Sequence, residues 1–304
     1  MKVLKPRKKS TYLLALEALD KRMVLADEDK RHLANMQSGF SGECGLDAWM
    51  AEALEAEALV LNDLLFTEKG SSFQVDSIVL TGDRIHLIEV KNYEGDYQFR
   101  EGHLVTFSGK KISNPLTKFH DTTTRMRNLL HKWNFRVDLE PSLIFVNPSF
   151  MMYHAPMDAP VVYPGQIQSY FSRLNRRALP LSPQHHYLAE KLLAEHQDEA
   201  AFQRKPPQYV YESLGKGLWC MECGASRLTL TQRSSICRAC GEKVSIDETV
   251  VSHCEEFRIL FPERKMTRNG IYDWCGRLVS PWQIQRILKS NFDQCGYARG
   301  TYYQ

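Results

Sequence analysis

The sequence predicts a mixed α/β protein of two or three domains, and three observations support this fold class. The chain has 304 residues, which is more than one small domain usually contains. Its composition, 43% hydrophobic and 25% charged residues, is that of a globular protein and excludes whole-chain disorder, collagen and coiled coil. In the first two thirds of the chain, segments with the periodicity of strands are mixed with segments with the periodicity of helices. Seven of the eight cysteines follow residue 219, which indicates a separate C-terminal region.

The charge and the cysteine distribution narrow the class further. The net charge of +3 excludes a strongly basic coat protein. No stretch approaches the ~18–20 apolar residues of a membrane span. The apolar stretch after the basic start carries Glu17 and Asp20, which a secretory signal would lack. Because this signal pattern is lacking, we expect a cytoplasmic protein. Clustered cysteines in a cytoplasmic chain favour metal binding over a disulfide scaffold.

Hydrophobic periodicity and turn residues predict the elements of the first domain. The segment Ser38–Gly42 has the composition of a loop, and Ser41 could cap the helix after it. The two-residue turn Gly82-Asp83 should join two strands as a hairpin. The predicted helices cover residues 10–36 (two short helices), 42–57, 114–133, 166–174 and 183–196. The predicted strands cover residues 59–66, 73–81, 84–92, 97–107 and 142–146.

Three charged residues lie on the two strands of the predicted hairpin. Asp76 belongs to the first strand, and Glu89 and Lys91 belong to the second. Residues two apart in a strand share a face, so Glu89 and Lys91 point the same way, roughly 7 Å apart along the strand. Charges on apolar strand faces are costly unless they are paired or bind metal. A cross-strand ion pair at a sheet margin and a metal site are both consistent with this pattern.

Phosphodiester hydrolysis with a divalent metal needs such a set of residues. Two or three carboxylates hold a hard cation such as Mg²⁺, and the backbone carbonyl of Val90 offers a further oxygen ligand. The cation polarises the phosphate and lowers the pKa of a bound water, while a lysine orients the water and offsets negative charge. Glu43 is a fourth candidate, although a carboxylate near a helix N-terminus is favourable in any case.

Five ordered blocks of the sequence resemble the nuclease-related (NERD) domain. The resemblance covers residues 38–150, with weaker similarity to about residue 200, and its specificity comes from the order of the blocks. The blocks are Gly39–Glu43 (GFSGE), Leu61–Leu65 (LNDLL), Phe73–Asp76 (FQVD), Ile88–Gly95 (IEVKNYEG) and Asn114–Leu116 (NPL).

The resemblance implies a fold and a set of site residues. That family is placed in the PD-(D/E)xK, restriction-endonuclease-like superfamily, whose fold is a central mixed sheet flanked by helices. The resemblance implies Asp76 and Glu89 as ligands of Mg²⁺ or Mn²⁺, with Lys91 as the catalytic lysine. It also implies Glu43 as an accessory acidic residue. Lys118 stands where the family often has glutamine, and a lysine there could contact phosphate.

Two Cys-x-x-Cys pairs, separated by thirteen residues, predict a structural zinc site in a zinc ribbon. The four ligands are Cys220, Cys223, Cys237 and Cys240. A glycine follows each pair, where the chain must turn with positive φ. Unpaired buried thiols and a redox dithiol are the alternatives. His253 and Cys254 have poor ligand spacing, and the remaining thiols, at Cys44, Cys275 and Cys295, are expected to be buried.

The C-terminal region has the pattern of a helix-turn-helix. A short helix over Met266–Cys275 precedes a Gly-containing turn, and Ser280 then caps a helix with Pro281 at its first position. The residues that could face a nucleic-acid groove are Gln283, Arg286 and Lys289. A packed helical hairpin would show the same pattern, and zinc ribbons bind nucleic acid, proteins or neither.

Together these observations predict a Mg²⁺- or Mn²⁺-dependent endodeoxyribonuclease whose C-terminal modules bind nucleic acid. We expect DNA as the partner and no membrane, and leave RNA and a homodimer open. The alternative is a non-catalytic nucleic-acid-binding or regulatory protein that keeps the nuclease fold. The predicted regions are a helical extension (1–37), the nuclease-related domain (38–202), a linker (203–215), the zinc ribbon (216–250) and the helix-turn-helix-like region (251–304).

Overall fold

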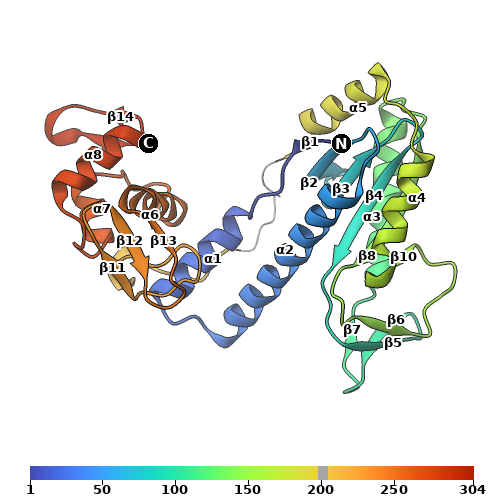
Figure 1. The fold of residues 1–304 in the computed structure, drawn as a ribbon, viewed down its shortest axis with the longest axis horizontal. Helices are drawn as coiled ribbons and strands as arrows, with labels where there is room; N and C mark the ends of the chain where they lie inside the picture. The colour runs from blue at the N-terminus through green and yellow to red at the C-terminus, as the bar shows by residue number, and fades with distance from the viewer. Residues whose placement is uncertain (198–204) are drawn as a thin grey trace. The chain divides into compact units, whose positions relative to one another are not determined.

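The computed structural model describes residues 1–197 and 205–304, which form two compact units that alternate along the chain (Figure 1). The first unit consists of Met1–Lys8 and Asn35–Gln203, and the second consists of Lys9–Ala34 and Arg204–Gln304. The sequence-based division set residues 1–37 apart as one extension, whereas the structure divides them between both units. The first two residues of the predicted linker lie outside the described residues.

The first unit contains a six-stranded mixed sheet, as the predicted fold class requires. β2, β3 and β4 are antiparallel to one another, whereas β1 pairs with β2, β4 with β8, and β8 with β10 in parallel. The predicted hairpin is confirmed as β3 and β4. In spatial order the strands are β1 (Lys2–Lys5), β2 (Leu59–Glu68), β3 (Ser71–Leu80), β4 (Arg84–Lys91), β8 (Asp138–Phe145) and β10 (Val161–Val162).

Helices cover both faces of this sheet (Figure 1). One apolar cluster joins the sheet to α3 (Pro115–Lys132) and α5 (Pro183–Ala194). A second cluster joins the other face to α2 (Asp27–Ala53) and α4 (Ile167–Arg177), which follows a short 3-10 turn. Both faces of the sheet are therefore removed from water, which is why its strands are almost continuously apolar.

A second, four-stranded sheet begins directly after β4. It places the strand that follows the Ile88–Gly95 block beside a strand that follows β8. Its strands, in spatial order, are β7 (Lys111–Ile112), β6 (His103–Thr106), β5 (Asp96–Arg100) and β9 (Met151–Tyr153).

The second unit combines the cysteine region with helices from both ends of the chain. α1 (Thr11–Arg22) packs on α6 (Ile246–Leu260). The Arg22 side chain is buried there, with its guanidinium carbon 3.5 Å from the ring centre of Trp274 and an ion pair to Glu256. The remaining elements are β11 (Leu228–Leu230), β12 (Ser234–Cys237), β13 (Lys243–Ser245), α7 (Arg268–Trp274), α8 (Pro281–Asn291), β14 (Gln294–Cys295) and β15 (Tyr302–Tyr303).

The structure differs from the sequence analysis at two helices. Residues 38–42 form no loop, because α2 runs through them without interruption. The glycines that suggested a loop are tolerated in a helix when tertiary packing stabilises it. The sequence analysis also placed no helix over Ile246–Leu260, where α6 begins with Ser245 as cap and Glu248 closing a capping box.

Candidate active site and cysteine cluster

The three charged hairpin residues lie where β3 and β4 separate. The described pairing of these strands runs from Leu80 and Ile85 to Ser77 and Ile88. Asp76 and Glu89 come next on their strands, whereas β4 stays paired with β8 as far as Lys91. Asp76 and Glu89 are therefore not paired with each other in the sheet.

Three hydrogen bonds link Asp76 to Val90 and Lys91 to Glu89 and Val90. The backbone N–H of Val90 donates to Oδ2 of Asp76 at 2.8 Å. The ammonium group of Lys91 donates to Oε1 of Glu89 at 2.5 Å and to the carbonyl of Val90 at 3.1 Å. The structure therefore brings together the four residues that the sequence analysis selected as metal ligands and catalytic lysine.

Burial raises the free-energy cost of keeping these groups charged. The exposed fractions of Asp76 and Glu89 are only 8% and 5%. Burial and the nearby Glu89 carboxylate raise the pKa of Asp76 to about 6. Burial lowers the pKa of Lys91, but attraction to Glu89 and Asp76 outweighs it and raises that pKa overall. The lysine is therefore fully charged at neutral pH.

The donor atoms of this group fit a hard divalent cation. Two carboxylates and a backbone carbonyl are the oxygen ligands that Mg²⁺ and Mn²⁺ prefer. Burial and the neighbouring Glu89 carboxylate raise the pKa of Asp76 to about 6, and a divalent cation would offset both the cost of burial and the repulsion. Asp76, Glu89 and the Val90 carbonyl are the atoms that could hold it.

Helix α2 brings Glu43 to the acidic side of this group. Burial and the charges of Asp76 and Asp63 raise the pKa of Glu43 to about 7, although Arg7 acts in the opposite direction. Arg7 donates from Nη1 to Oε2 of Glu43 at 2.9 Å and from Nε to Asp47 at 3.0 Å. The sequence analysis missed Arg7, because one arginine in a short basic segment carries no signal of its partners.

A close approach between α2 and the end of β4 explains the glycine of the GFSGE block. A Cβ atom added at Gly42 would lie 2.5 Å from Cβ of Asn92. The Asn92 side chain donates to the carbonyl of Ser38 at 2.8 Å, one turn earlier in the helix. Gly42 thus allows the helix to approach the strand closely, and this packing positions Glu43.

Lys118 lies apart from these contacts. It is exposed on α3, which Asn114 caps through a hydrogen bond to the backbone N–H of Leu116. Among the contacts of the described residues, none joins Lys118 to Asp76, Glu89 or Lys91. From this position Lys118 could still contact a phosphate that lies away from the site.

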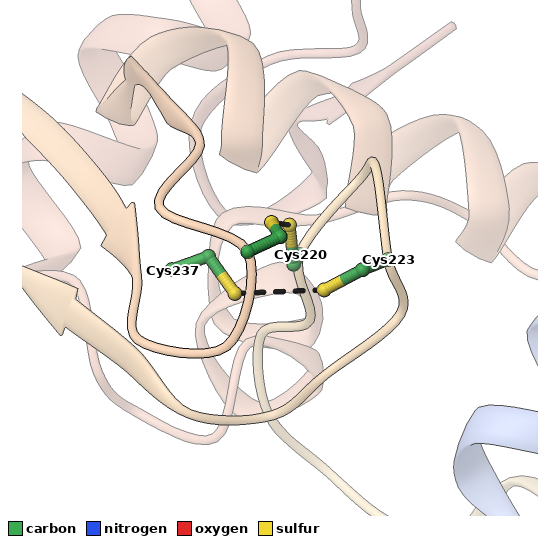
Figure 2. Close-up of side chains that lie close together, drawn as sticks. Cys220, Cys223 and Cys237 are labelled. Atoms are coloured by element: carbon green, nitrogen blue, oxygen red, sulfur yellow. Dashed lines mark hydrogen bonds between the residues drawn. The ribbon is translucent and has the colours of Figure 1, made fainter.

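The four predicted cysteines form a cluster in the second unit (Figure 2). Their sulfur atoms all lie within 4.8 Å of one another. The distance is 3.6 Å between Cys223 and Cys237 and 3.7 Å between Cys220 and Cys240. Tetrahedral zinc with Zn–S bonds of about 2.3 Å requires sulfur atoms about 3.8 Å apart, so this cluster can bind zinc.

The backbone around the cysteines supports the same conclusion. Gly224 and Gly241 have the positive φ angles that the sequence predicted, 70° and 78°. Each donates its N–H at 3.0 Å to the carbonyl of the first cysteine of its pair, which closes the two knuckles. Hydrogen bonds from the backbone of Cys240 and Ala239 lower the pKa of Cys237 to about 6, which favours the metal-binding thiolate.

The other candidate ligands are used elsewhere. His253 accepts from the backbone N–H of Trp219 at 3.0 Å through Nε2, and its Nδ1 lies 2.7 Å from the carbonyl of Thr249. The expectation of buried thiols is correct for Cys275 but wrong for Cys44, which is exposed. Cys295 is half-buried because it lies in the short terminal hairpin β14–β15.

Helices α7 and α8 are joined by a turn, as the helix-turn-helix pattern predicted. The turn contains Gly276 and Arg277, both with positive φ, and both helices pack on α6. Two of the three predicted groove residues bind their own unit. Gln283 donates to the carbonyl of Gln232 at 3.0 Å, and Arg286 pairs with Asp247 at 2.5 Å. Lys289 is exposed.

A comparison with family models covers this region of the first unit. Residues 38–146 match the family model of the nuclease-related domain (NERD). This part of the chain is therefore a nuclease-related domain, and its usual superfamily is PD-(D/E)xK.

Two further comparisons and a search for membrane spans complete these findings. The crystal structure of protein VC1899 from Vibrio cholerae is similar at 9% identity and a TM-score of 0.26, over 50% of this chain and 36% of that chain. The match therefore spans about a third of that protein's length. A search of curated proteins gave no match. Among the described residues, none of the helices has the length and hydropathy needed to cross a membrane.

Proposed function

We propose that this chain is a metal-dependent nuclease that hydrolyses phosphodiester bonds of DNA. The observation that carries the proposal is the contact of one lysine with two oxygens at a strand separation. Lys91 touches both the Glu89 carboxylate and the Val90 carbonyl, next to Asp76. A lysine at this place can bind a phosphate oxygen while carboxylates hold a cation beside it.

The residues of the chain have distinct roles in this reaction. Asp76, Glu89 and the carbonyl of Val90 would hold Mg²⁺ or Mn²⁺, which supplies polarisation of the phosphate and activation of water. Lys91 places a fixed positive charge next to the phosphate and offsets the negative charge that grows as water attacks. The Val90 N–H fixes the orientation of the Asp76 carboxylate.

Glu43 is suited to hold a proton near neutral pH. Its pKa of about 7 lies close to the pH at which a general acid or base works best. Hydrolysis removes one proton from the attacking water and returns one to the leaving oxygen. We assign Glu43 as an accessory group on the path of such a proton.

The second unit would supply nucleic-acid contacts. Sulfur occupies all four positions of a tetrahedral site at the cysteine cluster, so Zn²⁺ there would be structural. Lys289 and the neighbouring Trp282, whose side chain is 71% exposed, are available on α8. Because Gln283 and Arg286 bind their own unit, Lys289 is the predicted groove residue best placed for a phosphate.

Incubation of supercoiled plasmid with the full chain tests the proposal. We expect nicking with Mg²⁺ or Mn²⁺ that EDTA abolishes and that Glu89→Gln removes. Glu140→Gln is the matched control, because Glu140 lies on the neighbouring strand β8 and pairs with Arg84 away from the site. Parallel reactions on single-stranded DNA, branched DNA and RNA would define the substrate.

The same experiment separates the two candidate functions. An intact plasmid in all metal conditions, together with a stable protein–DNA complex in a gel-shift assay, would refute the nuclease. That outcome would support a nucleic-acid-binding protein that keeps the nuclease fold.

A further inference from the structure

The side chain of Arg7 is buried beside the candidate active site. Its side chain is only 2% exposed. It follows β1, whose Lys2 and Val3 pair with Leu59 and Val60 of β2. Arg7 thus enters the first unit from a segment that lies outside the nuclease-related match, residues 38–146.

The chain before Arg7 is anchored next to Asp63. The register of β1 on β2 shifts between Val3 and Lys5, and the Lys5 ammonium then donates to the carbonyls of Asn62 and Asp63 at 3.0 and 2.9 Å. Asp63 has a φ of +55°, which is unusual for a residue other than glycine. The anchored segment leads the arginine side chain to the acidic side of the site.

The guanidinium group joins three carboxylates to the backbone of a predicted metal ligand. Besides its bonds to Glu43 and Asp47, Nη1 lies 3.6 Å from Oδ1 of Asp63. Nη2 donates to the carbonyl of Asp76 at 3.1 Å. Arg7 therefore binds the backbone of Asp76, whereas the Val90 N–H holds the Asp76 carboxylate.

Arg7 keeps its charge in this position. Burial lowers its pKa, but the hydrogen bond to Asp47 and the charges of Glu43, Asp47 and Asp63 outweigh burial and raise it. A guanidinium is a planar, permanent cation with several donors in fixed directions. It can neutralise several carboxylates at once, as a metal ion does. Unlike a metal ion, it offers no coordination position to a substrate.

The charge of the whole site shows what Arg7 replaces. Five carboxylates gather around Arg7 and Lys91, and the Lys5 ammonium lies at the backbone of one of them. The five carboxylates are those of Glu43, Asp47, Asp63, Asp76 and Glu89. With these three basic groups the site carries a formal charge of −2, which one divalent cation neutralises. Without Arg7 it would carry −3, which one divalent cation does not neutralise.

We propose that Arg7 is the fixed counter-cation of this site, in the place that a second divalent cation would need, and that it holds Glu43 and Asp76 for a one-metal reaction. The inference rests on the proposed metal-dependent function. Arg7 acts through Glu43 and Asp76 rather than on the substrate, so it is a positioning residue. The nuclease-related segment then depends on a residue that precedes it by about thirty positions in the sequence.

Counting bound Mn²⁺ on the full chain tests this inference without any cleavage assay. We expect calorimetry and electron paramagnetic resonance to give one Mn²⁺ per wild-type chain, which Glu89→Gln removes. Arg7→Met keeps the side-chain length but removes the charge and should bind a second Mn²⁺. The matched control is Arg84→Met, because Arg84 pairs with Asp83 and Glu140 at the other end of β4. It should keep one Mn²⁺.

Arg7→Lys provides a milder variant in case Arg7→Met does not fold. An ammonium cannot reach Glu43, Asp47 and the Asp76 carbonyl together, so this variant should bind one Mn²⁺ about 10-fold more weakly, as expected for the loss of an outer-shell partner. Two Mn²⁺ ions in the wild type, or unchanged number and affinity in the Arg7 variants, would overturn the inference.

The outcomes also distinguish this inference from the proposed function. A chain that binds one Mn²⁺, gains a second in Arg7→Met and leaves all nucleic acids intact would refute the nuclease and support the counter-cation. Cleavage by a wild-type chain that binds two Mn²⁺ ions would refute only the counter-cation.

Discussion

The oxygen-rich site of the first unit and the sulfur cluster of the second are built on opposite principles. The four cysteines lie within Cys220–Cys240, and each pair is closed by a local hydrogen bond. The oxygen site takes residues from β3, β4, α2 and the segment after β1, and Arg7 reaches partners 36 to 70 positions away. The cluster therefore depends on a local motif, whereas the oxygen site depends on the whole sheet.

The two sites also differ in their ligand atoms and in whether a substrate could reach them. Four sulfur ligands leave no position for a substrate. The oxygen site has two carboxylates, a carbonyl and a lysine that is bound to two of these groups. This difference fits the proposed roles, which are catalysis at the oxygen site and stabilisation of the fold at the cysteine cluster. Variants of each site can test these roles.

Loss of one cysteine should have the largest effect on the comparison. Binding of structural zinc supplies on the order of 10 kcal/mol or more in small modules, so Cys220→Ser or Cys240→Ser should unfold residues 216–250. Hydrogen exchange would then rise there and stay unchanged in β3 and β4, and elemental analysis should fall from about one zinc per chain. Retained zinc with an ordered ribbon would contradict the structural role.

Variants of the oxygen site should have the reverse effect, with activity lost and fold retained. Asp76→Asn and Lys91→Met should lower the cleavage rate at least about 100-fold, equivalent to about 2.7 kcal/mol in the barrier. Asparagine can still accept from the Val90 N–H, so the circular dichroism spectrum should not change. Normal cleavage by both variants would show that the chemistry lies elsewhere.

Variants at Gly42 and at two other glycines of α2 can distinguish the effect of packing from that of helix propensity. Gly42→Ala places a methyl group 2.5 Å from Asn92 and should destabilise the chain by about 1–3 kcal/mol. Gly39→Ala and Gly45→Ala are matched controls in the same helix, because nothing lies within 4 Å of a Cβ at either position. Both controls should stabilise by about 0.5–1 kcal/mol in chemical denaturation. Equal effects at all three positions would remove the packing argument.

The stability of the metal-free oxygen site should depend on pH in a definite direction. The pKa of Asp76 is about 6 in the folded chain, above the value of ~3.9 in an unfolded chain. The folded state therefore binds the Asp76 proton more tightly than the unfolded state does. The stabilisation that this tighter binding provides is lost as the pH rises from about 4 to 6. Asp76→Asn removes this loss and should raise the melting temperature at pH 7 by about 2–4 °C, the effect of about 1 kcal/mol.

A second aspartate provides the control of opposite sign. The pKa of Asp83 is lowered, because hydrogen bonds from Thr81 and Arg84 outweigh burial. Asp83→Asn should therefore lower the melting temperature at pH 7 in buffer without divalent cations. A destabilising effect of Asp76→Asn under the same conditions would contradict the repulsion that we describe.

The smallest expected effect concerns DNA binding by the second unit. Each phosphate contact that is lost should reduce the slope of log affinity against log salt by about 0.9. Lys289→Ala should show this reduction for duplex DNA if α8 meets the backbone. Lys69→Ala, in the exposed turn between β2 and β3, should leave the slope unchanged. Equal slopes for Lys289→Ala and the wild type would make a protein the better partner for α8.

Sequence alone predicted those parts of the site that follow from short-range periodicity. The two-residue period of a strand placed Glu89 and Lys91 on one side, and their contact confirms this arrangement. The spacing of the cysteines likewise predicted their cluster. In both cases the backbone itself fixes the distance between residues that are close in sequence.

Features that depend on tertiary packing could not be predicted in this way. Composition indicated a loop at Ser38–Gly42, but α2 runs through that segment, which the Asn92 side chain contacts at Ser38. Arg7 has its partners on three different elements, and no local pattern specifies them. The hydrogen bond between Asp76 and Val90 depends on the point at which β3 leaves β4, which only the complete sheet determines.

The alternation of the two units along the chain has a consequence for protein synthesis. The buried face of α1, with Leu13, Leu16 and Leu19, packs on α6, and Arg22 and its partner Glu256 are 234 positions apart. At about 5–20 residues per second, α1 leaves the ribosome roughly 10–50 s before that partner exists. The first unit can fold in this interval while α1 exposes leucines to water. The nascent chain therefore carries an uncovered apolar helix face until α6 has been synthesised.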